Sequence, residues 1–178
     1  MTTDINIADA AIYVGTYKKY NESSLGGKWL KLSDYADKKE FYKACKKLHK
    51  DEQDPEYMFQ DYENIPESLI DESWLSDRFF EVRDAIENLG ENLKEPFMIW
   101  CNNGCGDLAK EDIDDLISAF ESEYIGEYDS EEDFARELVE ERDDLTDFAK
   151  QYFDYEAYAR DLFMGDNWSE GRYIFQNP

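Results

Sequence analysis

Acidic side chains outnumber basic ones by more than two to one in this chain, and that imbalance constrains how it can fold. The 178 residues include 44 Asp and Glu against 19 Lys and Arg, a formal net charge of -25 at pH 7. Such a chain repels itself and needs a substantial core to stay compact. Aromatic residues supply one, because they make up 16% of the sequence, far more than an acidic disordered tail contains. We therefore expect a folded, self-repelling protein.

The same charge argues against several classes of protein. DNA carries about one negative charge per 1.7 Å of duplex and selects Lys/Arg surfaces, so we expect no nucleic-acid partner. The longest apolar run, residues 97–101, is far short of the roughly 18 residues that a membrane-spanning helix needs. Residues 1–11 lack the basic and apolar regions of a signal peptide. Three cysteines, Cys45, Cys101 and Cys105, fit reduced thiols, so we expect a cytoplasmic protein.

Charge is unevenly distributed along the chain. Residues 1–50 contain ten Lys and six Asp or Glu, a net charge of +4, so the other 128 residues carry -29. Most of those lysines fall on one expected helix, residues 38–50, which does not resemble a duplex. The acidity belongs to the last two-thirds of the chain.

The first third reads as strand, strand, helix, strand. Residues 11–17 and 28–32 are rich in β-branched, aromatic or alternating apolar residues, and residues 57–62 follow an Asp-Pro break. Between them, Asp37 and Glu40 have the spacing of a helix N-cap pair. This order of elements predicts a small α+β module that ends near Pro66.

The middle of the chain predicts one long helix. Apolar residues recur there at alternating four- and three-residue steps, and Pro96 is expected to end the helix. That apolar series is Leu75, Phe79, Val82, Ile86, Leu89 and Leu93. The segment after Pro96, up to Gly106, is ambiguous.

The last third predicts three more helices and two strands. The expected helices are residues 111–123, a helix capped by Ser130 with Asp133 in the box position, and residues 154–163. The expected strands are residues 124–128 and 172–175. The fold class is therefore α+β, with short antiparallel sheets and helices.

Carboxylates line the outer side of these helices at helical spacing. Steps of four and three residues return to nearly the same side of a helix, and like charges so placed cost a few tenths of a kcal/mol per pair. The candidate acidic surface consists of Asp77, Glu81, Asp84, Glu91, Asp112, Asp115, Asp133, Glu137, Glu140 and Asp144. A net charge of -29 equals that of about 15 base pairs of duplex. If the chain is elongated, it can carry charge at the density of DNA.

Four long strings resemble the ArdA antirestriction proteins. They are IYVGTYKKYNESSLGGKWL (12–30), DPEYMFQDYENIP (54–66), GEYDSEEDFARELVEE (126–141) and FDYEAYARDL (153–162). The resemblance runs in order from about Ile12 to Phe175, and residues 138–156 resemble the segment known as the antirestriction motif.

This resemblance implies a DNA mimic, commonly encoded on mobile genetic elements such as conjugative plasmids or transposons, which promotes horizontal gene transfer. It would occupy the DNA-binding groove of type I restriction-modification enzymes and block cleavage of incoming DNA; whether methylation is blocked too stays open. It also implies a homodimer of elongated chains, each built of three modules. We place these at residues 10–68 (α+β), 69–108 (mainly helical) and 109–178 (acidic α+β).

Three alternatives remain. An enzyme finds little support, because no nucleophile-elbow, P-loop or zinc-protease string occurs and His49, the only histidine, is expected at the surface of the lysine-rich helix. A metal site drawn from Cys101, Cys105, Cys45 and His49 has weak spacing, and no calcium loop is complete, so we expect neither metal nor cofactor. The third alternative is an acidic binding module for another basic DNA-binding protein, as an inhibitor or chaperone.

Overall fold

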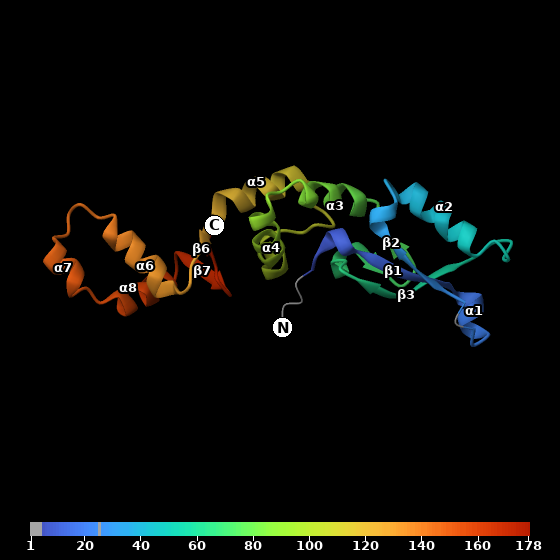
Figure 1. The fold of residues 1–178 in the computed structure, drawn as a ribbon, viewed down its shortest axis with the longest axis horizontal. Helices are drawn as coiled ribbons and strands as arrows, with labels where there is room; N and C mark the ends of the chain where they lie inside the picture. The colour runs from blue at the N-terminus through green and yellow to red at the C-terminus, as the bar shows by residue number, and fades with distance from the viewer. Residues whose placement is uncertain (1–4, 25) are drawn as a thin grey trace. The chain divides into compact units, whose positions relative to one another are not determined.

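The computed structural model describes residues 5–24 and 26–178 and shows an α+β fold (Figure 1). Its strands form three small antiparallel sheets within the described residues. The chain divides into two compact units, Met1–Ile117 and Ser118–Pro178. The boundary between them falls inside helix α5 (Ile113–Glu123). The division into three modules stays a prediction.

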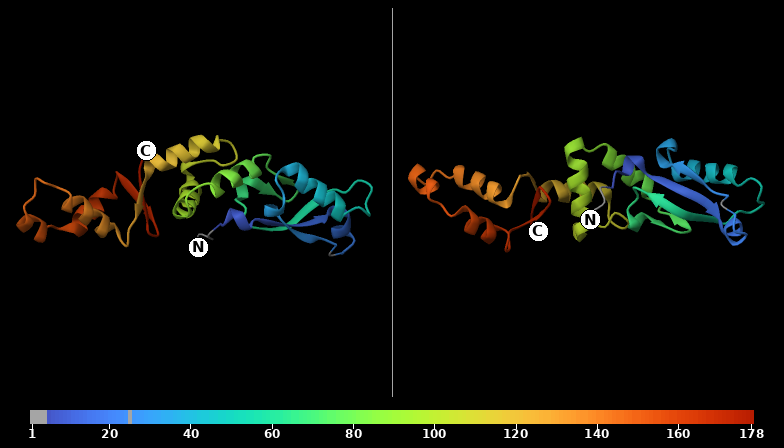
Figure 2. Two further views of the ribbon diagram at one scale, coloured as in Figure 1. Left: turned by 45° about the horizontal axis from the view of Figure 1, so that its top comes forward. Right: turned by 60° about the horizontal axis from the view of Figure 1, so that its bottom comes forward.

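The first unit is built on a three-stranded sheet of order β2-β1-β3. Its strands are β1 (Ala11–Thr16), β2 (Lys28–Lys31) and β3 (Tyr57–Glu63), and the short helix α1 (Tyr17–Asn21) follows β1. All three strands confirm the sequence prediction. Figures 1 and 2 show α2 (Lys38–Leu48) lying along this sheet.

The start of α2 has the predicted cap. The Asp37 carboxylate accepts a hydrogen bond from the backbone N–H of Glu40 at 2.8 Å, and the Glu40 carboxylate accepts one from the N–H of Ala36 at 3.0 Å. These bonds satisfy donors that a helix N-terminus leaves unpaired. The inner side of α2 then buries Phe41 and Cys45 against the sheet.

The single long helix predicted for the middle of the chain is wrong. Leu75 lies in strand β5 (Trp74–Leu75), which pairs with β4 (Ile70–Asp71). Two helices follow, α3 (Phe79–Glu87) and α4 (Glu91–Trp100), and a π-helical turn, Cys101–Cys105, continues α4.

The break and the proline have physical reasons. Gly90 precedes α4 with extended dihedrals, φ -55° and ψ 142°, and glycine is a poor helix former. Pro96 lies inside α4 instead of ending a helix. Its missing N–H would have bonded the carbonyl of Asn92, an exposed residue that water can reach. Apolar residues at three- and four-residue steps are expected both in one long helix and in two consecutive shorter ones, so this spacing cannot distinguish the two.

The second unit joins a small sheet to three helices. Strands β6 (Tyr124–Glu127), β7 (Asn167–Glu170) and β8 (Tyr173–Gln176) form an antiparallel sheet of order β6-β8-β7. The helices are α6 (Glu131–Glu140), α7 (Asp147–Gln151) and α8 (Tyr155–Leu162). Figure 1 shows α6 and α8 side by side, with α7 joining them at the end away from the sheet. Strands β6 and β8 and helices α5, α6 and α8 were predicted, whereas β7 and α7 were not.

Aromatic residues form much of the core of this unit. Phe120, Phe134 and Phe175 are buried, and the Trp168 ring stacks on Phe175 with centroids 4.1 Å apart. The aromatic load thus offsets the self-repulsion of an acidic chain.

Candidate functional site

Negative charge is concentrated in the second unit. Residues 118–178 contain 18 Asp and Glu against five Lys and Arg, a formal net charge of -13. Residues 1–117 contain 26 acids against 14 bases, a net charge of -12 over nearly twice the length. The second unit therefore has about double the charge per residue.

All ten carboxylates of the candidate acidic surface belong to exposed residues, and they are divided between the two units. Six lie in the first unit. Asp77 precedes α3, Glu81 and Asp84 lie on α3, and Glu91 is the first residue of α4. Asp112 and Asp115 lie at the start of α5, where the Asp112 carboxylate accepts hydrogen bonds from the N–H groups of Asp114 and Asp115.

Four of these six carboxylates are paired with cations of their own unit. Asp77 pairs with Lys38, Glu81 with Arg78 (3.7 Å), Asp84 with Arg83 (2.6 Å) and Glu91 with Lys94 (2.7 Å). Arg83 is buried, whereas the other three pairs lie at the surface and contribute roughly 0–1 kcal/mol each to stability. They do partly neutralise the acids, so this part of the surface presents less charge than its sequence indicates.

Three further carboxylates of the candidate acidic surface lie together on α6. Asp133, Glu137 and Glu140 follow one another at steps of four and three residues on its exposed side. The Glu137 carboxylate accepts a hydrogen bond from the Tyr128 hydroxyl at 3.0 Å. Burial, followed by this bond, raises the pKa of Tyr128, so the phenol stays a donor. Among the described residues, none of the three carboxylates forms an ion pair with a Lys or Arg.

Asp144 does not extend this stripe, contrary to the prediction. Helix α6 ends at Glu140, and Asp144 lies in the following turn. Arg142 donates two hydrogen bonds to its carboxylate, at 2.9 and 2.7 Å, and these lower its pKa. Five acids between residues 137 and 144 crowd the negative end of the helix dipole. That repulsion favours an early end to the helix.

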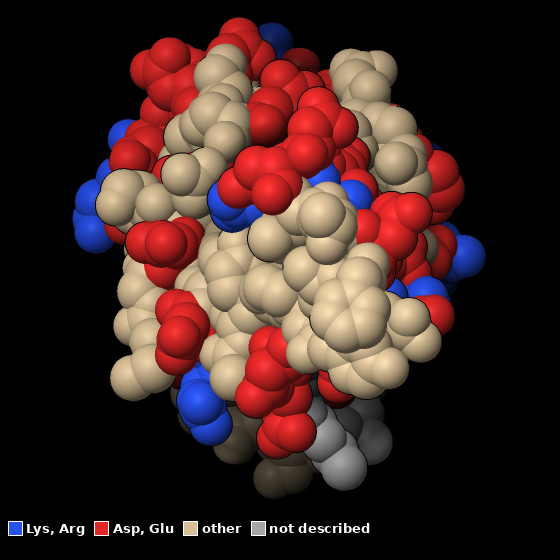
Figure 3. All heavy atoms as spheres, turned by 90° about the vertical axis from the view of Figure 1, so that its left-hand side faces the viewer, with Lys and Arg blue, Asp and Glu red and all other residues tan. Residues whose placement is uncertain are grey.

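An exposed aromatic pair at α7, Phe148 on the helix and Tyr152 just past its end, was not predicted from the sequence. Phe148 and Tyr152 are 72% and 71% exposed, and their ring centroids are 4.9 Å apart. Figure 3 looks at the end of the molecule where α7 lies and shows uncharged atoms bordered by carboxylates. The four-residue spacing of two aromatics between acids was the signal that could have located this pair.

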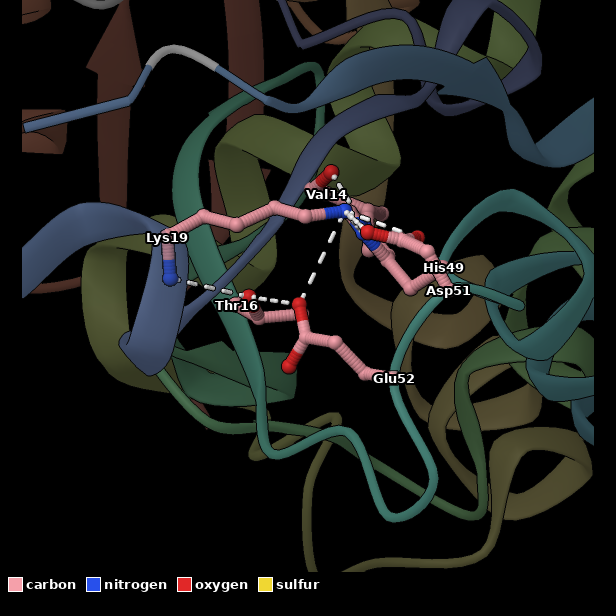
Figure 4. A network of polar contacts seen from close by, with 6 residues as sticks. All are labelled: Val14, Thr16, Lys19, His49, Asp51 and Glu52. Atoms are coloured by element: carbon pink, nitrogen blue, oxygen red, sulfur yellow. Dashed lines mark hydrogen bonds and ion pairs between the residues drawn. The ribbon is translucent and has the colours of Figure 1, made fainter. Parts of the chain in front are cut away.

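The histidine is not at the surface, which corrects the expectation for His49. It is fully buried at the end of α2 (Figure 4). Its Nε2 lies 3.1 Å from the carbonyl oxygen of Val14, and its Nδ1 lies 3.1 Å from Nζ of Lys19. A carbonyl only accepts, so Nε2 carries the proton and Nδ1 accepts from the lysine. His49 directly follows the last residue of α2, and the chain turns there so that the ring is buried against β1.

The same network holds two carboxylates near Lys19. Its ammonium lies 2.9 Å from Asp51 and 3.6 Å from Glu52, and the Thr16 hydroxyl donates to Glu52 at 2.7 Å. The histidine therefore has a structural role in joining α1, β1 and the end of α2.

Two of the three cysteines are buried. They are Cys45 and Cys101, and burial raises the pKa of each thiol to about 12. Among the residues that the structure describes, no group of three or more His, Cys, Asp or Glu side chains is arranged to hold a metal ion.

Comparison with known families identifies the chain. The family model of the antirestriction protein ArdA matches residues 12–175. This chain belongs to the ArdA antirestriction family. No curated protein matches it. Membership of the ArdA family implies an antirestriction function and an interaction with restriction enzymes. No helix in the described part of this ArdA chain is long and apolar enough to cross a membrane.

Proposed function

We propose that this protein is a DNA mimic that occupies the DNA-binding groove of type I restriction-modification enzymes and thereby blocks cleavage of incoming DNA. It acts as a stoichiometric inhibitor and not as a catalyst, in the cytoplasm, as a homodimer of elongated chains. Its partner is the DNA-binding subunit of the restriction-modification enzyme. We also propose the division into the modules 10–68, 69–108 and 109–178.

The observation that carries the mechanism is the exposed carboxylate series on α6. Asp133, Glu137 and Glu140 project from one side of a helix in a unit of net charge -13. Successive members are about 5–6 Å apart along the helix, with no Lys or Arg paired to them among the described residues. A groove lined by Lys and Arg to bind phosphates would attract such a surface at long range.

Competition for the enzyme tests this proposal. The protein is titrated into a type I restriction enzyme bound to fluorescently labelled DNA, and release of the DNA is followed by anisotropy. We expect complete release at about one inhibitor per DNA-binding site, together with loss of cleavage. Loss of cleavage while the DNA stays bound would contradict mimicry of DNA.

A matched pair of variants locates the working surface. The α6 variant D133N/E137Q/E140Q and the α3–α4 variant E81Q/D84N/E91Q each remove three negative charges. The second set is already paired with Arg78, Arg83 and Lys94, so we expect the α6 variant to lose at least tenfold more affinity. Equal losses would show that net charge alone matters.

The alternative is an acidic module for some other basic DNA-binding protein. Titration of the protein into an unrelated DNA-binding protein of similar positive charge measures its affinity for that protein, and this affinity distinguishes the alternative from the proposed function. The proposed function requires a clear preference for the restriction enzyme at physiological ionic strength.

A further inference from the structure

The outer side of α2 carries a series of lysines that mimicry of DNA does not explain. Lys39, Lys43, Lys46 and Lys50 follow one another at steps of four, three and four residues, from the first turn of α2 to just past its end, and all are exposed. Such steps place them on one side over roughly 16 Å. Lys47 is exposed beside them. We call these five residues the α2 lysine face.

These lysines are unpaired, unlike most cations elsewhere. Within the described residues, no member of the α2 lysine face forms an ion pair with an acid. Of the nine Lys and Arg after residue 50, seven do: Arg78, Arg83, Lys94, Lys110, Arg136, Arg142 and Arg172. The α2 lysine face therefore keeps its positive charge available, unlike most cations after residue 50.

Nearby acids do little to cancel that charge. Asp77 is paired with Lys38 and Asp51 with Lys19. Asp37 and Glu40 keep their full negative charge, but they lie at the start of α2, about one and a half turns or more from Lys46, Lys47 and Lys50. At about 0.1 M salt the Debye length is roughly 10 Å, so acids farther away are largely screened. The five lysines of the face therefore concentrate positive charge on one side of α2, although the chain as a whole is strongly negative.

We propose that the α2 lysine face binds the sugar–phosphate backbone of duplex DNA without regard to sequence. Lysine is a compact point charge suited to phosphate oxygens. The face has no Arg, Asn or Gln among its lysines, and these are the side chains that read base edges most often.

Two other negatively charged partners, an acidic protein and a lipid membrane, fit the α2 lysine face less well. Protein interfaces are depleted in Lys and rely on buried aromatic or Arg anchors, and the outer side of α2 presents none. A membrane-surface helix inserts its apolar side into lipid, whereas the apolar side of α2 faces the sheet, with Phe41 and Cys45 buried in the core. Binding of a phosphate backbone requires only the positive charge of the lysines, so it is the partner that fits this face best.

The expected affinity is modest and depends on salt. Four phosphate contacts predict a fall of about a hundredfold between 50 and 200 mM salt. Because the whole chain carries -25, repulsion from the rest of the protein weakens this contact further. Binding at low salt would correct the expectation, drawn from the net charge, that the protein has no nucleic-acid partner.

The test is anisotropy of a labelled 20-base-pair duplex with the full-length protein at 50 mM salt. The variant K39Q/K43Q/K46Q removes three charges from the face. Its matched control, K18Q/K28Q/K31Q, removes three exposed, unpaired lysines outside α2. We expect at least a tenfold loss for the first and less than a threefold loss for the second, with K39R/K43R/K46R binding like the wild type.

Several results would overturn the proposal. They are no binding by the wild type at 50 mM salt, equal losses in the two Gln variants, or binding of poly-glutamate as tight as that of the duplex. Circular dichroism checks the fold, and Lys and Gln have similar helix propensities. Inhibition of the restriction enzyme is measured on the same variants. It is expected to persist, because the face lies outside the α6 carboxylates.

Discussion

The ammonium group of Lys19 donates a hydrogen bond to Nδ1 of His49 across 3.1 Å, although the two residues lie 30 positions apart in the sequence. The other ring nitrogen of His49 donates to the carbonyl of Val14 at 3.1 Å. One buried side chain therefore fastens α1 and the end of α2 to the central strand of the sheet.

Replacing His49 should destabilise the first unit. Leucine would leave the Val14 carbonyl without its donor and Lys19 without one acceptor, so we expect His49→Leu to lower the free energy of unfolding by about 1–3 kcal/mol. Glutamine has both a donor and an acceptor, and His49→Gln should lose less. Urea unfolding followed by circular dichroism measures both, and equal losses would contradict a hydrogen-bonding role.

The buried thiols should make the protein sensitive to alkaline pH. The pKa of Cys45 and of Cys101 is raised from 9.0 to about 12. The unfolded state therefore releases these protons first, and stability is lost as pH rises from about 9 toward 12. Each thiol contributes a loss of about 1.4 kcal/mol per pH unit in that window.

Unfolding of the wild type and of Cys45→Ala in reducing buffer from pH 8 to 11 checks this prediction. The variant should lose stability less steeply with pH, whatever its stability at pH 8. Parallel curves would show that Cys45 does not contribute, because ionisation of the tyrosines is common to both proteins.

Reversing one carboxylate should barely affect inhibition. Glu137→Lys removes a single phosphate-like contact among many, so we expect less than a threefold change in the concentration that halves cleavage. Reversing Asp133, Glu137, Glu140 and Asp144 together should weaken inhibition by at least a hundredfold. Loss of all inhibition from the single change would rule out a distributed charge mechanism.

Inhibitor binding should depend strongly on ionic strength. Contacts between carboxylates and a groove of Lys and Arg are screened by salt, so the affinity measured by competition should fall steeply between 50 and 200 mM. Sodium chloride titration of the complex gives the slope. A flat response would indicate an apolar interface, for which Phe148 and Tyr152 are the exposed candidates.

Dimerisation is predicted from the family resemblance. Light scattering of the purified protein should give two chains per particle. A mass of 21.0 kDa, that of one chain, would remove the homodimer from the proposed function.

Local signals in the sequence predicted much of the fold. The cap of α2 by Asp37 and that of α6 by Ser130 depend on residues three positions apart, and both form as expected. Strands such as β1 and β8 were visible from their β-branched and aromatic residues. These features depend on neighbours in sequence, which a single chain displays directly.

Features set by distant contacts or by competing local effects were missed. The apolar series through Leu75 and Phe79 gave no sign that one residue joins a strand and the other begins a helix. The burial of His49 depends on Val14 and Lys19, which precede it by 35 and 30 residues. Helical spacing also placed Asp144 on α6, because it ignored the repulsion among acids at the end of that helix.

Exposure of the ten candidate carboxylates was a safer inference than their arrangement. An unpaired charge is costly to bury, so an acidic chain keeps such groups in water. Which acids pair with cations cannot be read from periodicity alone. The pairing of Asp77 with Lys38 joins residues 39 positions apart.

Each helix of the second unit is started by an oxygen close to it in the chain. Ser130, Thr146 and Asp154 accept hydrogen bonds from the N–H groups of Asp133, Ala149 and Ala157. Together with the aromatic interior, these short-range bonds specify the scaffold without help from the outward-facing acids. Single substitutions can therefore move those acids over the surface at little cost in folding free energy. The surface can then change to fit a different target enzyme while the scaffold stays the same.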